Sequence, residues 1–311
     1  MTIHSPGRDV SGFFQKQEAP AVVHDLPPIP GLRKSIRITP PEVQLFSNYI
    51  YTVCGIYIES SKAYLLETRL GKIMESEGCN SFSDFYHRIR NDTSRTLQSR
   101  VIDAITTNET LFFRDISPFE LLKFKILPEV IDKAAKLSQV PVPIRIWSAA
   151  CSTGQEVYSI AMVLKELLGD LGRYNIKLLG TDLSDAAIKQ ASYGVYNKFE
   201  IERGLERERL QRYFEASGGC WKIRSELRSV AQFRKLNLME SFTALGKFDI
   251  IFCRNVAIYF KLEDRKKLFN KIAECLDSDG FLVIGATESL TGVCPQFIPK
   301  RHLKSIFYQL H

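Results

Sequence analysis

The sequence contains no long apolar run. None of its hydrophobic stretches approaches the roughly 18 to 20 residues that a helix needs to cross a bilayer, although 45% of the residues are hydrophobic. The first residues, MTIHSPGRDVSGFFQKQ, also lack the unbroken apolar core of a secretory signal. We therefore expect a cytoplasmic protein that does not insert directly into a membrane.

Paired metal or disulfide ligands are missing as well. The cysteines number seven, no two of them form a C-x-x-C pair, and Cys151 and Cys253 lie inside apolar runs. Free, reduced thiols are therefore expected. The five histidines are scattered, and none stands at ligand spacing from a cysteine. This pattern argues against a metal site.

What the chain does contain is typical of a globular protein. Its 311 residues give enough material for one large or two ordinary domains, and 25% of them are charged. The formal net charge is +7. Such a balance favours an acidic partner, either a nucleic acid or an acidic protein surface, and charge alone does not choose between them.

Composition and periodicity divide the chain into four parts. We expect a flexible, proline-rich tail over 1–34, a helical domain over 35–105, a linker with its helix over 106–140, and a mixed α/β domain over 141–311. The helical domain shows helical patterns over 40–56, 62–78 and 81–90. Pro40 suits a helix start, Gly78 a helix end, and Ser83 a helix N-cap.

The fourth part alternates between strand and helix patterns. Strands are predicted at 144–147, 176–182, 248–253, 280–285 and 303–310, and helices at 155–169, 184–194 and 262–280. This alternation predicts a doubly wound, Rossmann-like α/β sheet with right-handed crossovers. Residues from about 214 to 236 break the rhythm and predict a small inserted antiparallel β-subdomain, with a turn at Gly218 and Gly219 between two short strands.

Polar residues at the ends of the predicted strands indicate a ligand site, because open α/β sheets bind ligands outside the carboxyl ends of their strands. The first strand runs into SAACSTGQE (148–156), where small residues and Gly154 let the backbone approach a ligand. The second ends at Asp182, a position that suits hydrogen bonds to ribose hydroxyls. The alternative role of Asp182 is a helix N-cap, for which Ser184 is better placed.

The sequence lacks the G-x-G-x-x-G fingerprint that seats a pyrophosphate. A cofactor without phosphates needs only a close turn, a ribose carboxylate and polar groups for its amino-acid end. Among adenosine-containing cofactors, S-adenosyl-L-methionine therefore fits better than a nicotinamide dinucleotide.

Four stretches are specific enough to indicate a family: TTNETLFFRD (106–115), IWSAACSTGQEVYSIAM (146–162), GTDLSDAAIKQASYGVY (180–196) and FDIIFCRNVAIYF (248–260). Together, and in this order, they closely resemble the motifs of the chemotaxis receptor methyltransferases, the CheR family. The resemblance covers roughly residues 36–310. It implies a helical domain joined to a methyltransferase domain with a small β-subdomain. It also implies transfer of a methyl group from S-adenosyl-L-methionine to glutamate side chains of methyl-accepting chemotaxis receptors.

The resemblance also implies roles for individual residues. It gives Asn108, Thr110, Arg114, Glu156, Asp182, Asn237, Leu238, Cys253 and Arg254 as cofactor-binding, and Arg254, Tyr259 and Arg114 as catalytic. Without the neighbouring motifs, Arg254 alone would be interpreted as a solvated arginine at a strand end, and a packed aromatic side chain is the alternative role of Tyr259.

The basic pair Arg69 and Lys72 lies three residues apart, and hence on one face of its predicted helix. By resemblance, this face recognises the acidic helices of the receptor, whereas a solvated basic face is the alternative. Three departures from the family pattern are mild: Gln155 and Val157 in the first loop, and Ala257 after the fourth strand. The β insertion is about three residues shorter than in relatives that dock onto a receptor pentapeptide, so we expect methylation without that tether.

A glutamate acceptor is ionised at neutral pH, because its unperturbed pKa is about 4.3. The expected reaction therefore needs no general base, which agrees with the lack of a base-and-nucleophile constellation in the four motifs. Two other functions remain open: a nucleic-acid methyltransferase, and a non-catalytic cofactor-binding signalling protein. The first is disfavoured because CRNVAIYF has no Asn/Asp-Pro-Pro-aromatic motif.

Overall fold

The computed structural model describes Met1 and residues 36–311. The predicted tail over 1–34 falls outside the described residues, apart from Met1. The helical domain is confirmed. It consists of α1 (Pro40–Cys54), the short 3-10 turn η1 (Ser60–Lys62), α2 (Ala63–Ser76), α3 (Phe82–Asn91) and α4 (Thr96–Ile105). These helices pack around a core of their own, in which Phe46 lies 5.9 Å from both Phe82 and Phe85 between ring centres.

Helix α1 begins at Pro40, as predicted. The Thr39 N–H donates to the Glu42 carboxylate at 2.9 Å, and the other carboxylate oxygen accepts from the Ser83 N–H at 2.7 Å, so one side chain links the starts of α1 and α3. The prediction of Ser83 as the cap of α3 is wrong. Helix α3 starts at Phe82, two residues earlier than a cap at Ser83 would place it, and it is Ser81 whose hydroxyl accepts from the Asp84 N–H at 3.0 Å.

The linker ends in a continuous helical run made of α5 (Ser117–Leu121), a π turn η2 (Leu122–Ile126) and α6 (Leu127–Lys136). Its buried side chains, among them Phe119 and Leu122, join the core on one face of the main sheet. The run therefore anchors the linker to the domain that follows it.

The main sheet has seven strands in the order β6-β2-β1-β7-β8-β10-β9. Their bounds are β1 (Val142–Ala149), β2 (Tyr174–Asp182), β6 (Ala231–Lys235), β7 (Phe248–Cys253), β8 (Leu276–Ile284), β9 (Phe297–His302) and β10 (Ser305–Leu310). The pairs from β6 to β8 are parallel, and those of β10 with β8 and β9 are antiparallel. The doubly wound sheet is thus confirmed.

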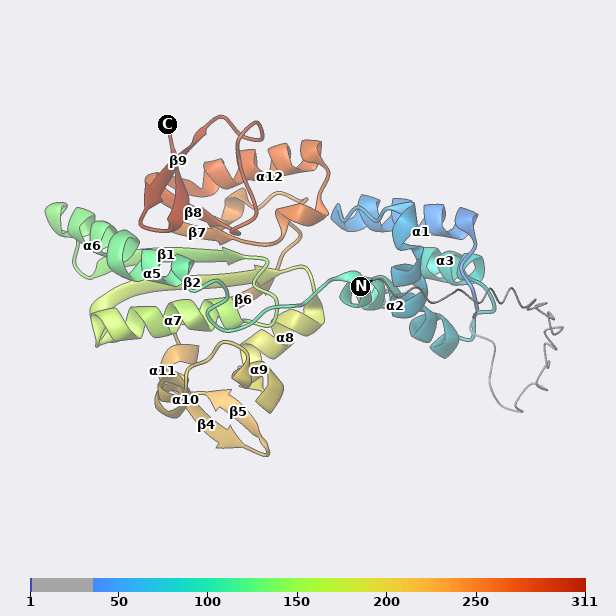
Figure 1. The fold of residues 1–311 in the computed structure, drawn as a ribbon, viewed down its shortest axis with the longest axis horizontal. Helices are drawn as coiled ribbons and strands as arrows, with labels where there is room; N and C mark the ends of the chain where they lie inside the picture. Colours follow the sequence, from blue (N-terminus) through green and yellow to red (C-terminus); the bar gives the residue numbers. More distant parts are fainter. Residues whose placement is uncertain (2–35) are drawn as a thin grey trace. The chain divides into compact units, whose positions relative to one another are not determined.

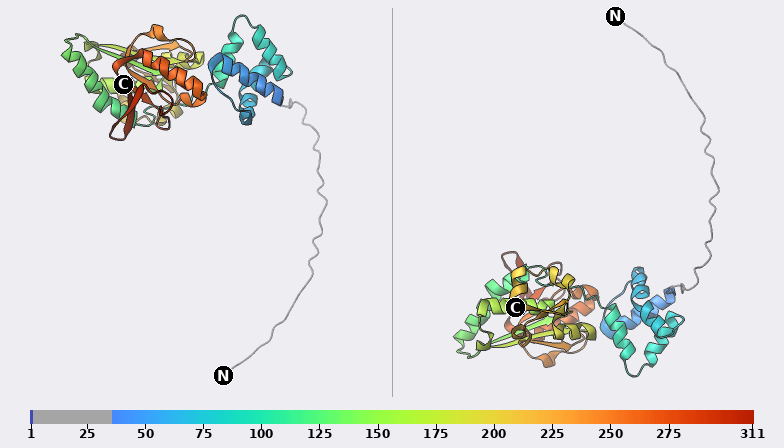
Figure 2. Two further views of the ribbon diagram at one scale, coloured as in Figure 1. Left: turned by 90° about the horizontal axis from the view of Figure 1, so that it is seen from above. Right: turned by 90° about the horizontal axis from the view of Figure 1, so that it is seen from below.

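Helices cover both faces of this sheet. Figure 1 shows α7 (Gln155–Leu168) and α8 (Asp185–Tyr193) on one face and α12 (Leu262–Cys275) on the other, and two further views give the same division (Figure 2). Side chains of β7 alternate between the two cores: Phe252 packs on the α7 face, whereas Cys253 packs on the α12 face. Arg254, the next residue, therefore points toward the α7 side.

A small antiparallel sheet joins β4 (Phe214–Ser217), β5 (Cys220–Ile223) and β3 (Val195–Tyr196). The turn at Gly218 and Gly219, both with positive φ, lies between β4 and β5 as predicted. The predicted extent, 214–236, is too long for this sheet, because β6 pairs with β2 and is the edge strand of the main sheet. The remaining elements are α9 (Lys198–Glu202), α10 (Arg207–Tyr213), α11 (Ser225–Arg228), η3 (Leu171–Arg173), η4 (Thr243–Leu245) and η5 (Ala257–Tyr259).

Two boundaries differ from the prediction. Helix α12 ends at Cys275 rather than near 280, because Leu276 already pairs with Phe248 and opens β8. The edge strand β9 was not predicted, since five of its six residues are at least partly solvent-facing and Pro299 interrupts the pattern. No helix of the described residues is both long and apolar enough to span a bilayer. All seven cysteines are unpaired.

Two glycine substitutions test how closely α7 packs on the sheet. A Cβ on Gly180 in β2 would lie 2.8 Å from Val157 of α7 and 2.9 Å from Phe233 of β6. Gly180→Ala should therefore lower the free energy of unfolding by about 1–3 kcal/mol through overpacking. Gly71→Ala is the control, because Gly71 lies within α2 with no atom within 4 Å of an added Cβ. It should stabilise the fold by about 0.5–1 kcal/mol. Urea unfolding followed by circular dichroism measures both, and the same sign for the two variants would contradict the packing argument.

Candidate active site

A cavity opens at the carboxyl ends of β1, β2 and β7, where the strand order reverses on either side of β1. Of the residues predicted to bind the cofactor or act in catalysis, those that line it are Asn108, Thr110, Arg114, Glu156, Asp182, Asn237, Leu238, Arg254 and Tyr259. They come from the linker, from α7 and from the ends of three strands. The fold thus brings together residues that are up to 151 positions apart in the sequence.

The loop between β1 and α7 borders the cavity through Ala150, Cys151 and Ser152. Ala150 and Ser152 both have positive φ, 61° and 51°, so the backbone turns sharply here. Gly154 was predicted to let the backbone approach a ligand, but it is not among the residues that line the cavity. An added Cβ would lie 2.8 Å from Ala191, so this glycine, with φ of 94°, instead allows the loop to pack against α8.

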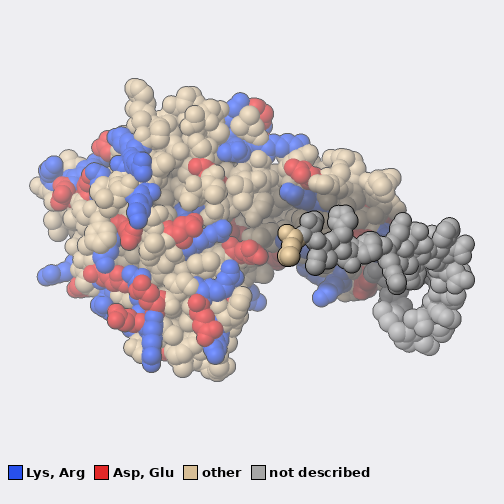
Figure 3. All heavy atoms as spheres, viewed as in Figure 1, with Lys and Arg blue, Asp and Glu red and all other residues tan. Residues whose placement is uncertain are grey.

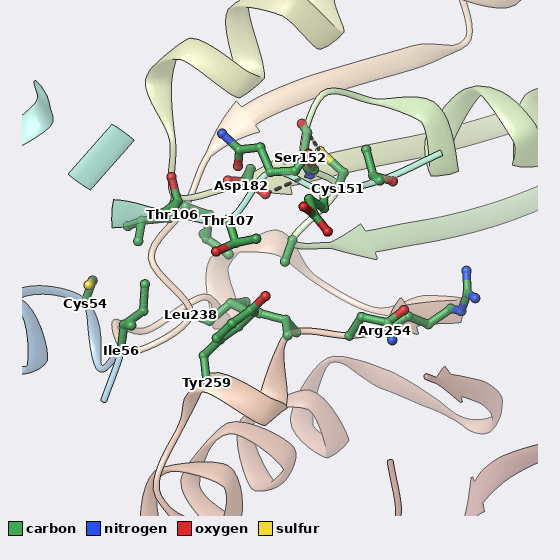
Figure 4. Close-up of a pocket in the computed structure, with 18 of the residues that line it drawn as sticks. Cys54, Ile56, Thr106, Thr107, Cys151, Ser152, Asp182, Leu238, Arg254 and Tyr259 are labelled. Carbon is green, nitrogen blue, oxygen red and sulfur yellow. Dashed lines mark hydrogen bonds between the residues drawn. The ribbon is translucent and has the colours of Figure 1, made fainter. Parts of the chain in front are cut away.

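The Asp182 carboxylate lines the cavity beside Cys151 and Ser152 (Figure 4). It accepts hydrogen bonds from the N–H groups of Ser152 at 2.8 Å and Ser184 at 3.0 Å. Ser184 caps α8, because its hydroxyl accepts from the Ala187 N–H at 3.0 Å, so Asp182 is not needed as a cap. Burial raises the pKa of Asp182, and the backbone N–H donors offset part of this rise. Hydroxyl donors from a ligand would complete the solvation of this carboxylate.

Arg254 is almost completely buried, with 1% of its side chain exposed. Its guanidinium donates to Glu156 at 2.9 Å, to the Arg114 carbonyl at 2.8 Å and to Asp115 at 3.0 Å. It also lies 5.7 Å from the centre of the Phe119 ring. Nε is buried without a partner in the described residues. In Figure 4 the Arg254 side chain extends away from Cys151, Ser152 and Asp182. Arg254 therefore ties together the linker, the start of α7 and the end of β7.

The linker residues line the cavity in two ways. The Asn108 carbonyl accepts from the Ser152 hydroxyl at 3.1 Å, which fixes the linker over the first loop. Arg114 is half-buried, and its guanidinium donates only to the Glu109 carbonyl, at 3.2 Å, among the described residues. Its other N–H groups remain available to an anionic group in the cavity.

Asn237 and Leu238, which follow β6, also line the cavity. The Asn237 side chain donates to the Val53 carbonyl of α1 at 2.9 Å and accepts from the Met239 N–H at 3.0 Å. Its amide is thus used by the protein. Leu238 is buried and presents an apolar wall. This part of the cavity suits a flat aromatic group.

The helical domain supplies a wall that the sequence analysis missed. Cys54 and Ile56, at the end of α1, line the cavity. Tyr51 and Tyr57, on either side of them, are anchored to the α/β domain: the Tyr51 hydroxyl donates to Asp264 at 2.6 Å, and the Tyr57 N–H donates to the Tyr259 carbonyl at 3.0 Å. No sequence signal marked these residues, because their apolar spacing looks like an ordinary helical core.

Three further residues hold the polar turn after β7 and were not singled out. Asn255 has φ of 57°, and its N–H donates to Glu288 at 2.7 Å. The same Glu288 oxygen accepts from the Gly285 N–H at 2.8 Å. Asp115 pairs with Arg254. Only the tertiary structure brings residues 285–288 beside the turn.

Tyr259 lines the cavity and is half-buried, and its hydroxyl has no protein hydrogen-bond partner within residues 36–311. Cys253 does not line the cavity. Its side chain is fully buried in the α12-side core, where burial raises the pKa of the thiol. A role for Cys253 in contacting a ligand through its side chain is therefore not supported.

Arg69 and Lys72 lie outside the cavity. The Arg69 guanidinium donates to the Ile105 carbonyl at 2.5 Å and to the Thr107 hydroxyl at 3.1 Å. It thereby holds the first residues of the linker. Lys72 is exposed. The two members of the predicted basic pair thus have different surroundings.

The chemistry of the cavity fits S-adenosyl-L-methionine. Asp182 offers a carboxylate for ribose hydroxyls, Leu238 and Ile56 offer apolar walls, and Arg114 and the unpartnered Nε of Arg254 offer donors for the carboxylate of the amino-acid end. Together with the doubly wound sheet, this arrangement defines an S-adenosylmethionine-dependent methyltransferase.

Comparisons with known proteins agree. Residues 108–303 match the family described as "CheR methyltransferase, SAM binding domain", and residues 41–106 match "CheR methyltransferase, all-alpha domain". The chain is 40% identical over 273 residues, 86% of this chain and 97% of the relative, to "Chemotaxis protein methyltransferase Cher2" of Pseudomonas putida. It is 43% identical over 257 residues, 81% and 91% of the two chains, to "Chemotaxis protein methyltransferase 1" of Pseudomonas aeruginosa. The protein belongs to the CheR family of methyltransferases, and its cofactor is S-adenosyl-L-methionine.

The buried cross-link made by Arg254 can be tested by substitution. Arg254→Ala leaves Glu156, whose side chain is 13% exposed, without its cation, and stranding a buried charge typically costs about 3–5 kcal/mol. Asp115 is 43% exposed, so water can solvate it when the arginine is removed. We expect the affinity for S-adenosylhomocysteine, measured by calorimetry, to fall by roughly 10- to 100-fold, because only part of that cost should appear as lost binding. Arg254→Lys should recover little, since an ammonium cannot bridge three acceptors in this fork geometry.

The control is Arg301→Ala, which removes an exposed arginine from the edge strand β9 and should leave binding unchanged. Thermal unfolding of each variant shows that it is folded. If Arg254→Ala bound the ligand and methylated normally, Arg254 would have no part in the site.

Proposed function

We propose that this protein transfers the methyl group of S-adenosyl-L-methionine to glutamate side chains of chemoreceptors and so forms glutamyl methyl esters. The printed names of the relatives, which are chemotaxis methyltransferases, support the setting. The observation that carries the reaction type is the makeup of the cavity. Among residues 36–311, its lining holds two arginines and a tyrosine but no histidine or lysine. Its buried carboxylates are already bonded, Asp182 to backbone N–H groups and Glu156 to Arg254. Such a lining suits an acceptor that arrives already ionised.

The acid–base chemistry supports this assignment. A glutamate carboxylate is charged at neutral pH without help, whereas an amine or hydroxyl acceptor needs a base to take its proton. The two thiols in the cavity wall are poor bases or nucleophiles, because burial raises the pKa of Cys54 to about 11 and that of Cys151 well above its ordinary value. A carboxylate acceptor is therefore the acceptor that this lining best serves.

The methyl donor supplies an electrophilic methyl group on a sulfonium centre. We assign Asp182 to the ribose hydroxyls, Leu238 and the backbone at Asn237 to the adenine, and Thr110 and Asn108 to the linker side of the donor. Their task is to hold the donor in one orientation.

Arg254 acts as a positioning residue in this proposal, because its two terminal guanidinium nitrogens are bonded to Glu156 and the linker, and only Nε has no partner among the described residues. Arg114 and Tyr259 have free donors in the cavity and would orient the two carboxylates, that of the donor and that of the acceptor. The hydrogen bonds from Arg114 or Tyr259 to the acceptor carboxylate must stay weak, since a tightly held carboxylate oxygen is a weaker nucleophile.

Geometry provides the remaining acceleration. The acceptor oxygen must approach the methyl carbon in line at about 3 Å, and such positioning can contribute about 7 kcal/mol or more. The wall formed by Cys54 and Ile56 excludes water from one side. The helical domain thus assists the reaction by shielding one side of the cavity from water.

For the partners, we propose the acidic cytoplasmic helices of chemoreceptors, and we place the reaction in the cytoplasm, in keeping with seven free cysteines. Lys72 is exposed and suits direct recognition of an acidic helix. We also propose that no pentapeptide tether is required. In support, the hairpin of β4 and β5 is short, with four residues in each strand and two glycines between them.

A nucleic-acid substrate has less support. On the face shown in Figure 3, basic and acidic side chains are interspersed and do not form one large basic area. A non-catalytic role has no specific observation in its favour.

A labelling assay tests the function. Purified protein is incubated with methyl-labelled donor and with receptor cytoplasmic fragments, with or without their C-terminal pentapeptide, and in parallel with RNA. We expect label on both receptor fragments, and we expect mild base to release it as methanol, because it is an ester. Label on RNA alone, or base-stable label on protein, would overturn the proposal. A need for the pentapeptide would overturn only the absence of a tether.

The two basic residues of α2 make a separate prediction. Lys72→Glu should raise the KM for receptor by roughly 3- to 10-fold at low salt, with a smaller effect at high salt, and should leave donor affinity unchanged. Arg69→Ala should weaken donor binding as well, since Arg69 holds Ile105 and Thr107 beside the cavity. Lys136→Glu, at the end of α6, is the control and should change neither quantity. Unchanged kinetics for Lys72→Glu would remove this face from receptor recognition.

A further inference from the structure

Exposed apolar side chains gather beside the cavity mouth. Tyr57 is 46% exposed, Ile258 56% and Leu262 51%. All three lie near Tyr259. Ile258 precedes it directly in the sequence, Leu262 follows it by three residues, and the Tyr57 N–H donates to the Tyr259 carbonyl at 3.0 Å. We call these residues, together with Lys261, the rim surface. Exposed apolar side chains grouped beside a cavity are candidates for a protein-binding surface.

The rim surface is held in place from both domains. Lys261 Nζ lies 4.4 Å from the centre of the Tyr51 ring and 4.5 Å from that of Tyr57, so the ammonium is fixed between two aromatic rings. The Tyr51 hydroxyl donates to Asp264, in the first turn of α12. A surface fixed in this way needs little ordering when a partner binds, which favours affinity.

The short reach of a glutamate side chain shows what must touch this surface. Its carboxylate extends roughly 4 to 5 Å from its own Cα. The backbone that carries the acceptor must therefore come close to the cavity mouth. On a helix, side chains three and four positions away lie about 5–6 Å from the acceptor side chain. Those neighbours necessarily rest on the residues around the mouth, and the rim surface forms one side of it.

We propose that the rim surface is the docking site for the receptor segment that carries the acceptor glutamate, an inference that rests on the proposed function. Tyr57, Ile258 and Leu262 contact an apolar residue three or four positions from the acceptor, and Lys261 contacts an acidic residue of the same helix. The occupant is an acidic amphipathic helix. A second copy of this chain fits less well, because a two-fold contact would face this surface with another basic surface of the same kind and would offer Lys261 no acidic partner from within it.

Two enzyme variants test the inference, with receptor fragment and methyl donor as substrates. Ile258→Ser and Leu262→Ser each remove a half-exposed apolar side chain that docking would bury, and should raise the KM for receptor roughly 5- to 30-fold, from about 1–2 kcal/mol of lost burial. The kcat at saturating receptor and the affinity for S-adenosylhomocysteine should stay within twofold. Leu137→Ser is the matched control. This leucine is 61% exposed and lies between α6 and the amino end of β1, whereas the cavity lies at the carboxyl ends of the strands, so the variant should leave the KM unchanged.

Four results would overturn the inference: an unchanged KM in both variants, an equal rise in Leu137→Ser, a parallel loss of donor affinity, or a wild-type dimer that either variant dissociates. A failure of the proposed function would be recognised from a different result. In that case the wild-type protein itself transfers no base-labile label to receptor.

Discussion

One buried guanidinium joins the parts on which the site depends. Arg254 follows the central strand β7, and it bonds to Glu156 at the start of α7 and to the linker at residues 114 and 115. Burying a cation is unfavourable unless its donors are satisfied, so the two carboxylates and the carbonyl must come together around it. The closure of the linker over the sheet and the shape of the cavity therefore depend on one another. The polar interruption after the apolar strand is thus a structural requirement as well as a chemical one.

Much of this arrangement could be predicted from the sequence. Strands β1, β2 and β7 are apolar runs that end in polar residues, and parallel strands place such ends at one edge, so the convergence of Asp182 and Arg254 follows from topology. The capping role of Ser184 also follows from local rules, because an N-cap hydroxyl acts on residues three positions away. Local rules misplaced the start of α3 by two residues, since Ser81 and Ser83 are equally good caps and only the burial of Phe82 chooses between them.

Other features depend on contacts that no local pattern encodes. The pairing of β6 with β2 could not be told from membership of the small sheet, because both environments accept the same short strand. Cys54 and Ile56 look like core residues of the helical domain until the second domain is placed beside them. The resemblance gave Cys253 as a ligand contact, but the alternation of β7 turns its side chain into the core.

The contact between the Tyr57 N–H and the Tyr259 carbonyl has a thermodynamic consequence. The cavity has walls from both domains, so a ligand that fills it contacts both of them in this arrangement. Any such ligand stabilises that arrangement by RT ln(1 + [L]/Kd), about 2.7 kcal/mol at a concentration of 100 Kd. By reciprocity, if filling the cavity strengthens the binding of a partner that contacts both domains, that partner strengthens the binding of the small molecule by the same factor. Occupancy of the pocket and engagement of the outer surface are therefore linked wherever a bound partner contacts both domains at once.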